Sequence, residues 1–134
     1  MIALSGPLGA GKTVFARAFI GALGVVGNVP SPTFSLLQSY DAMAGECPVK
    51  IHHFDFYRLE RAADVWNLGY EETLDDGIAI IEWADRFPRL LPADRLRIDL
   101  RYGGREDERR ADLTGFGHWR ERWATVVRAI GPSG

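Results

Sequence analysis

Apolar and polar positions near the start of the chain follow two different periods. Ile2–Leu4 form a short apolar run that stops at a glycine-rich turn. Beyond this turn, apolar residues recur at helical spacing, which predicts a helix over residues 13–23 that ends in a left-handed cap at Gly24. The apolar positions of this helix are Val14, Phe15, Ala18, Phe19, Ala22 and Leu23. The first elements are therefore expected in the order strand, glycine loop, helix.

The middle of the chain contains three runs that are typical of strands. Residues 35–40 and 49–54 favour β structure, and the polar residues 41–48 between them suit the loop of a loose hairpin. Residues 62–76 predict short helical pieces that are broken at Gly69. The continuous apolar run Ile78–Ile81 then predicts a strand that is buried on both faces, as strands of parallel sheets are.

The last third of the chain adds antiparallel strands and a helix. Apolar residues alternate with charged ones over residues 96–102, which predicts a strand with one wet face, and residues 110–114 are expected to pair back with it. A C-terminal helix carries Trp119, Trp123, Val126, Val127 and Ile130 on one side, as core residues. These patterns together predict an α/β fold with a mostly parallel central sheet plus antiparallel strands.

The composition is that of an ordinary globular protein. The 134 residues include 16 Lys and Arg against 18 Asp and Glu, a net charge of −2, and 46% are hydrophobic. The length fits a single domain, residues 1–134, and the near-neutral charge excludes a general affinity for polyanions. One cysteine, no apolar run of about 20 residues and no export signal predict a cytoplasmic protein without disulfides or membrane spans.

The glycine-rich turn carries the first clear chemistry. Residues 6–13, GPLGAGKT, fit the phosphate-binding pattern of Gly, four residues, Gly, Lys and Ser or Thr. In such loops the lysine, here Lys12, reaches the β- and γ-phosphates, and the hydroxyl of Thr13 binds Mg²⁺. The loop residues expected to surround the phosphates are Gly6, Leu8, Gly9, Ala10 and Gly11. The motif predicts nucleotide binding by a P-loop NTPase-like, three-layer α/β sandwich.

Phosphoryl transfer also needs carboxylates that hold the metal or orient the attacking water. Asp55 follows the predicted strand 49–54, and Glu82 directly follows the predicted strand 78–81. Because parallel sheets bind ligands at the carboxyl ends of their strands, both side chains are expected beside the loop. His53 is either a hydrogen-bonded structural histidine or a catalyst, and the sequence favours neither role.

Two further segments are candidates for contact with the nucleotide because of their position in the chain. Residues 31–34, Ser-Pro-Thr-Phe, lie in the loop after the first predicted helix, where switch elements approach the γ-phosphate, and they also suit an ordinary turn. Trp83 either stacks on a nucleotide base or covers the core.

Four motifs taken together resemble the TsaE (YjeE) family, the small P-loop ATPases of bacterial tRNA threonylcarbamoyladenosine synthesis. They are GPLGAGKT, SPTF at 31–34, HFDFYRL at 53–59, and EW at 82–83 followed by Asp85-Arg86. The resemblance implies a cytoplasmic, Mg²⁺-dependent ATPase that is slow alone and works with the TsaD and TsaB proteins. That assembly attaches a threonylcarbamoyl group to the adenosine beside the anticodon in tRNAs that read codons beginning with A, so tRNA would be reached through the complex.

The resemblance also implies roles for individual residues. Lys12 would bind phosphate, Thr13 and Glu82 would hold Mg²⁺, Thr33 would be the switch threonine, Asp55 would assist the metal or the attacking water, and Trp83 would contact the base. Two features depart from the family. Pro7 stands where the family usually has an acidic residue, and family members normally carry a further segment before the first strand, so a short N-terminal segment is expected to be missing.

Three other functions compete with this interpretation. A small-molecule kinase would need a lid with arginines, for which Arg86 and Arg89 are candidates, but no extended lid segment is visible. A GTPase would need an Asn/Thr-Lys-x-Asp run, and the only lysines are Lys12 and Lys50, neither in that context. The third alternative is a nucleotide-gated assembly factor in which bound ATP orders a docking surface.

Overall fold

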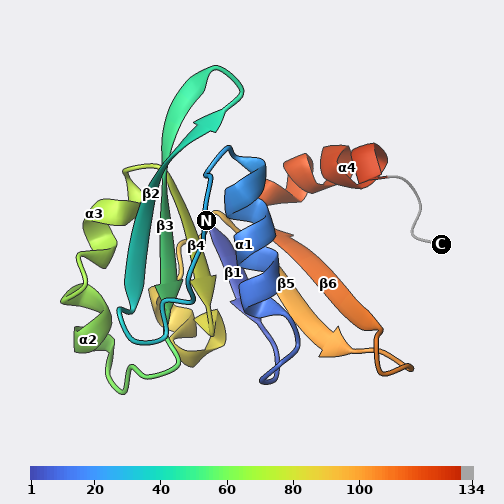
Figure 1. Ribbon diagram of the computed structural model, residues 1–134, viewed down its shortest axis with the longest axis horizontal. Helices are drawn as coiled ribbons and strands as arrows, with labels where there is room; N and C mark the ends of the chain where they lie inside the picture. The colour runs from blue at the N-terminus through green and yellow to red at the C-terminus, as the bar shows by residue number, and fades with distance from the viewer. Residues whose placement is uncertain (131–134) are drawn as a thin grey trace.

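A six-stranded sheet forms the centre of the structure, a computed structural model that describes residues 1–130 except the side chains of Val127 and Ile130 (Figure 1). The strands are β1 (Ile2–Ser5), β2 (Leu37–Ala44), β3 (Cys47–Asp55), β4 (Ile78–Glu82), β5 (Arg95–Tyr102) and β6 (Arg109–Phe116). Their order across the sheet is β2-β3-β4-β1-β5-β6. The central strands β3, β4, β1 and β5 run parallel, whereas β2 and β6 pair antiparallel at the two edges. The predicted mixture of parallel and antiparallel strands is confirmed.

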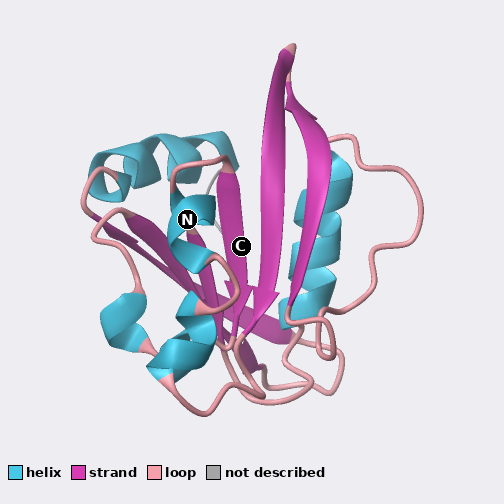
Figure 2. Ribbon diagram, turned by 90° about the vertical axis from the view of Figure 1, so that its left-hand side faces the viewer, coloured by secondary structure: helices cyan, strands magenta, loops and turns pink. Residues whose placement is uncertain are grey.

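Helices cover both faces of the sheet. They are α1 (Lys12–Ala22), α2 (Ala62–Trp66), α3 (Tyr70–Leu74) and α4 (Trp119–Ile130), with short 3₁₀ turns η1 (Ala84–Arg86) and η2 (Pro88–Leu90). In Figure 2, α1 lies along one side of the strands, and the short helices lie on the other. The result is the predicted three-layer α/β sandwich. No helix within residues 1–130 is long and apolar enough to cross a bilayer.

The core consists of two apolar layers, one on each side of the sheet. Leu4 and Ile80 pack with Ile20 of α1 on one face, and Phe54 and Ile81 pack with Tyr70 of α3 on the other. All six side chains are fully buried, and burial of each large apolar side chain stabilises the fold by roughly 1.5–3 kcal/mol. Since β4 contributes to both layers, its continuous apolar run is explained as predicted.

The hairpin formed by β2 and β3 is longer than expected, and the prediction of a loop over residues 41–48 is wrong. Pairing continues from Leu37 opposite Phe54 to Ala44 opposite Cys47, which leaves a two-residue turn at Gly45-Glu46. The outer half of this hairpin projects beyond β4, whose pairing with β3 begins at Ile51 (Figure 1). Ala42 and Val49 at the base of this arm pack against the core, whereas residues 43–48 are exposed. The exposed positions need no alternation of apolar residues, so their sequence resembles a loop.

The buried side of α1 agrees only in part with the expected one, because Phe15, Phe19 and Leu23 pack partly buried against the core as predicted. Lys12, Ala16 and Ile20 are buried, whereas Val14, at 68% exposure, and Ala18 face away from the sheet. The small and apolar residues of α1 leave two overlapping buried faces possible, and the position of Lys12 in the phosphate loop selects the one that is buried. In α4, Trp119 and Trp123 pack against the core as predicted; the side chains of Val127 and Ile130 lie outside the described residues.

Candidate nucleotide-binding site

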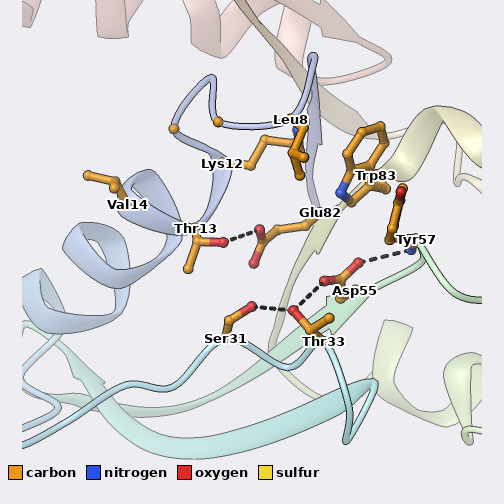
Figure 3. Close-up of a pocket in the computed structure, with 12 residues that line it drawn as sticks. Leu8, Lys12, Thr13, Val14, Ser31, Thr33, Asp55, Tyr57, Glu82 and Trp83 are labelled. Carbon is orange, nitrogen blue, oxygen red and sulfur yellow. Dashed lines mark hydrogen bonds between the residues drawn. The ribbon is translucent and has the colours of Figure 1, made fainter. Parts of the chain in front are cut away.

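The carboxyl ends of β3 and β4 place three polar side chains on one face of the sheet. Asp55 lies opposite Glu82 in the parallel pairing, and His53 lies one alternation earlier on β3. All three are buried, with exposures of 4%, 2% and 0% for Asp55, Glu82 and His53. Both carboxylates project into the same pocket below the glycine loop (Figure 3). The carboxyl ends of two adjacent strands therefore converge as the sequence predicts.

The glycine loop connects β1 to α1 in a conformation that side chains disfavour. Gly6, Gly9 and Gly11 have φ angles of 144°, 78° and 108°, and Gly6 lies so close to the Leu100 carbonyl of β5 that a Cβ atom would overlap it. Within residues 1–130 no side chain caps the N-terminus of α1. Its first backbone amides therefore remain available to an anion, which is the arrangement of a phosphate-binding helix terminus.

Lys12 is held inside the loop. Its Nζ donates hydrogen bonds to the carbonyl oxygens of Gly6 at 2.6 Å and Pro7 at 3.0 Å, and it lies 3.9 Å from the centre of the Trp83 ring. Burial lowers the pKa of Lys12 below its ordinary value of 10.5, and the nearby Glu82 carboxylate opposes this effect. A phosphate that enters the loop has to replace these carbonyls as the partner of the ammonium group.

Glu82 joins the loop to the sheet. The Thr13 hydroxyl donates to Oε1 of Glu82 at 2.5 Å, and Nε2 of His53 hydrogen-bonds Oε2 at 2.6 Å. A hydroxyl and a carboxylate side by side are the ligand types that Mg²⁺ takes next to nucleotide phosphates. Because Mg²⁺ is usually held by one or two carboxylates together with phosphate oxygens and waters, the Thr13 and Glu82 oxygens fit such an ion. Within residues 1–130 there is no cluster of three or more His, Cys, Asp or Glu side chains that could hold a metal.

Asp55 is the second carboxylate of the pocket. The Thr33 hydroxyl donates to its Oδ2 at 3.3 Å, and the backbone N–H of Tyr57 donates to its Oδ1 at 2.9 Å. Ser31 Oγ lies 2.8 Å from Thr33 Oγ1. Burial raises the pKa of Asp55 above 3.8, and the two hydrogen bonds counteract part of this effect. The segment 31–34 thus reaches the site through Thr33, which connects the loop after α1 to the end of β3.

Trp83 has an unusual backbone that sets the direction of its indole. Its φ of 57° is left-handed, a conformation that costs a non-glycine residue about 1–2 kcal/mol. The indole contacts the ring of Tyr57, with centroids 4.7 Å apart, as well as the ammonium of Lys12. In this structure the indole therefore lies at the lysine end of the pocket, and the expected contact with a nucleotide base stays a prediction.

These residues surround one pocket of about 290 Å³ (Figure 3). Its lining consists of Leu8, Gly9, Gly11, Lys12, Thr13, Val14, Ser31, Thr33, Asp55, Tyr57, Glu82 and Trp83. Two loop residues from the expected set, Gly6 and Ala10, are not in the lining: Gly6 presents its carbonyl to Lys12, and Ala10 is buried in the core. Arg86, a candidate lid residue of a kinase, instead donates to the Leu59 carbonyl at 2.7 Å.

Two residues that line the pocket, Tyr57 and Val14, were not expected at the site. Tyr57 binds Asp55 through its backbone and covers Trp83 with its ring. A carboxylate two residues before a backbone N–H is the spacing of an Asx turn, which is the signal that could have identified Tyr57. Val14 was assigned to the apolar face of α1 but lies at the mouth of the pocket, because the first turn of α1 continues the loop.

Known proteins resemble this chain along most of its length. The family described as "Threonylcarbamoyl adenosine biosynthesis protein TsaE" matches residues 1–111. The tRNA threonylcarbamoyladenosine biosynthesis protein TsaE of Streptomyces coelicolor is 40% identical over 130 residues, which cover 94% of this chain and 84% of that protein. The protein of the same name from Bacillus subtilis is 36% identical over 119 residues, which cover 88% of this chain and 71% of that protein.

A solved structure extends the similarity to the fold. The crystal structure of Bacillus subtilis YdiB superimposes with a TM-score of 0.73 and 28% identity, and the match covers 97% of this chain and 78% of that one. The sequence motifs, the loop geometry and these similarities agree. The chain therefore belongs to the TsaE family of tRNA threonylcarbamoyladenosine biosynthesis proteins.

Proposed function

We propose that this protein binds ATP with Mg²⁺ in the pocket of Figure 3 and hydrolyses it during threonylcarbamoylation of the adenosine beside the anticodon. The observation that carries the proposal is the 2.5 Å hydrogen bond between Thr13 and Glu82. It joins the helix end of a phosphate-binding loop to a carboxylate at the end of a parallel strand. The protein would act in the cytoplasm with TsaD and TsaB, and the tRNAs modified would be those that read codons beginning with A. It would reach tRNA through the TsaD and TsaB proteins.

Each residue of the pocket has a part in this proposal. The amides of the loop and the first turn of α1 surround the phosphates, and Lys12 exchanges its loop carbonyls for phosphate oxygens. Thr13 and Glu82 hold Mg²⁺, which when bound neutralises charge on the phosphates. The two oxygens of Glu82 are engaged by Thr13 and His53.

Asp55 is the better candidate for orienting the attacking water. Burial raises its pKa, which makes the carboxylate a stronger proton acceptor than an exposed aspartate. Thr33 holds Asp55 through its hydroxyl and comes from a loop, so it can respond to the γ-phosphate as a switch residue. Hydrolysis would thus be coupled to the position of residues 31–34.

Variants of two loop-contacting residues separate binding from turnover. Lys12→Ala is expected to abolish ATP binding, whereas Glu82→Ala should still bind ATP but lose Mg²⁺-dependent release of phosphate. Glu71→Ala removes an exposed carboxylate on α3 and serves as the matched control. Turnover in Glu82→Ala equal to that of the control would exclude Glu82 from the mechanism.

The role in tRNA modification requires a separate measurement. ATP hydrolysis should be slow for the isolated protein and faster when TsaD and TsaB are both added. Absence of stimulation would leave a general ATPase and contradict the proposed role. Transfer of the phosphoryl group to a nucleoside or sugar, in place of phosphate release, would favour a small-molecule kinase.

A further inference from the structure

We propose that His53 is a positioning residue that holds Glu82 in the orientation needed for metal binding. The inference rests on the proposed function, because it assigns Glu82 to Mg²⁺. His53 Nε2 lies 2.6 Å from Oε2 of Glu82, and the other carboxylate oxygen, Oε1, accepts the hydroxyl of Thr13. The histidine thus engages one oxygen from behind and leaves the other directed at the phosphate loop.

His53 does not touch the pocket. Its side chain is fully buried, with 0% exposure, and it is absent from the residues that line the cavity. It therefore acts on a nucleotide through Glu82, which excludes direct acid or base catalysis in this conformation. Of the two possibilities that the sequence leaves open, the contact fits the hydrogen-bonded histidine, and the proposal gives that hydrogen bond a role in positioning Glu82.

The hydrogen bonds define which nitrogen carries the proton. Among the residues that the structure describes, His53 Nδ1 is buried and has no hydrogen-bond partner. A proton on Nδ1 would bury an unsatisfied donor, and the neutral Nδ1–H form would also place the Nε2 lone pair against a carboxylate oxygen. The neutral Nε2–H form avoids both costs. His53 Nε2 is thus the donor to Glu82.

A donor behind the carboxylate suits a group that has to hold a cation. It fixes the rotation of the carboxylate about its last bond and leaves Oε1 directed at the phosphate loop. Strand geometry adds a second advantage. Because residues two apart on a strand share a face, β3 presents His53 and Asp55 on the same side, one behind Glu82 and the other beside it.

Two substitutions separate donation from packing. His53→Gln retains an amide N–H that can reach the position of Nε2, and it loses nothing at Nδ1, which has no partner among the described residues. His53→Leu fills a similar volume without a donor. We expect the Gln variant to stay within about threefold of the wild type, whereas the Leu variant should need about 10- to 100-fold more Mg²⁺ or lose as much in kcat. ATP binding without Mg²⁺ should be unchanged in both.

A measurement on the nucleotide-free protein tests the contact without using activity. Long-range ¹H–¹⁵N NMR spectra of the wild type should show His53, one of three histidines, in the Nε2–H form, and its signals are identified as those that disappear in His53→Gln. An Nδ1–H form at His53 would overturn the proposal, as would a folded Leu variant with unchanged Mg²⁺ dependence and kcat. If the NMR result is as expected but the wild type does not hydrolyse ATP, the proposed function fails while the contact stands.

Discussion

The same chemical change at two glycines should have opposite effects on stability. Gly6 has a φ of 144°, and a Cβ there would overlap the Leu100 carbonyl oxygen while lying 3.2 Å from the carbonyl carbon. Gly21 lies in α1 with ordinary helical backbone, and a Cβ there meets nothing within 4 Å. Gly6→Ala therefore adds strain and a steric clash, whereas Gly21→Ala reduces only the freedom of the unfolded chain.

The structure supports a rough magnitude for each variant. At Gly6 the backbone strain costs about 1–3 kcal/mol and the overpacking costs about as much again, so the free energy of unfolding should fall by about 2–6 kcal/mol. At Gly21 the gain should be about 0.5–1 kcal/mol. With a urea m-value of about 2 kcal/mol/M, the midpoints should move by roughly −1 to −3 M and +0.25 to +0.5 M.

Urea unfolding of the nucleotide-free protein, followed by far-UV circular dichroism, measures both shifts. The two variants serve as controls for each other, because each adds one methyl group. A Gly6→Ala midpoint at or above that of the wild type would refute the assignment of a glycine-specific loop conformation. A Gly21→Ala midpoint well below the wild type would refute the placement of that residue in an open helical position.

Three further substitutions test other contacts. Tyr70→Phe removes the hydroxyl that donates to the Leu90 carbonyl at 2.9 Å and should lower the free energy of unfolding by about 1 kcal/mol in urea titrations. Burial raises the pKa of Tyr70 to about 12, so ultraviolet titration of the wild type should show this tyrosine protonated at pH 10. The folded-state pKa of Asp55 is raised above 3.8, so its contribution to stability is present below that pH and is lost as pH rises through the folded pKa. Asp55→Asn should thus raise the urea midpoint at neutral pH, by a margin that shrinks toward pH 3.8, and a lower midpoint at neutral pH would contradict this reasoning. Tyr102→Phe removes the hydroxyl that binds the Leu8 carbonyl and should weaken ATP binding severalfold in calorimetry, whereas unchanged affinity would show that β5 does not support the loop.

Much of the architecture could be read from local patterns. A glycine loop between a strand and a helix, the apolar run of β4 and the alternation of β5 each reflect a physical requirement that acts within a few residues. The loop needs positive φ angles, and β4 needs apolar side chains on both faces. Local requirements of this kind leave a signature at consecutive positions, so these elements were predicted with nearly correct bounds.

Other features depend on segments that meet only in the folded chain. The sequence contains His53, Asp55 and Glu82, but the pairing of β3 with β4 decides how they meet. Asp55 lies opposite Glu82 in the pocket, and His53 hydrogen-bonds Glu82 from behind the pocket. The length of the β2–β3 hairpin and the buried side of α1 are likewise set by neighbouring strands, not by local periodicity. The spacing of residues along the chain identifies the chemical groups of the site, whereas the register between strands decides which of these groups are in contact. The reason is that hydrogen-bonded strand pairing fixes positions to within a few ångströms, whatever their separation in sequence.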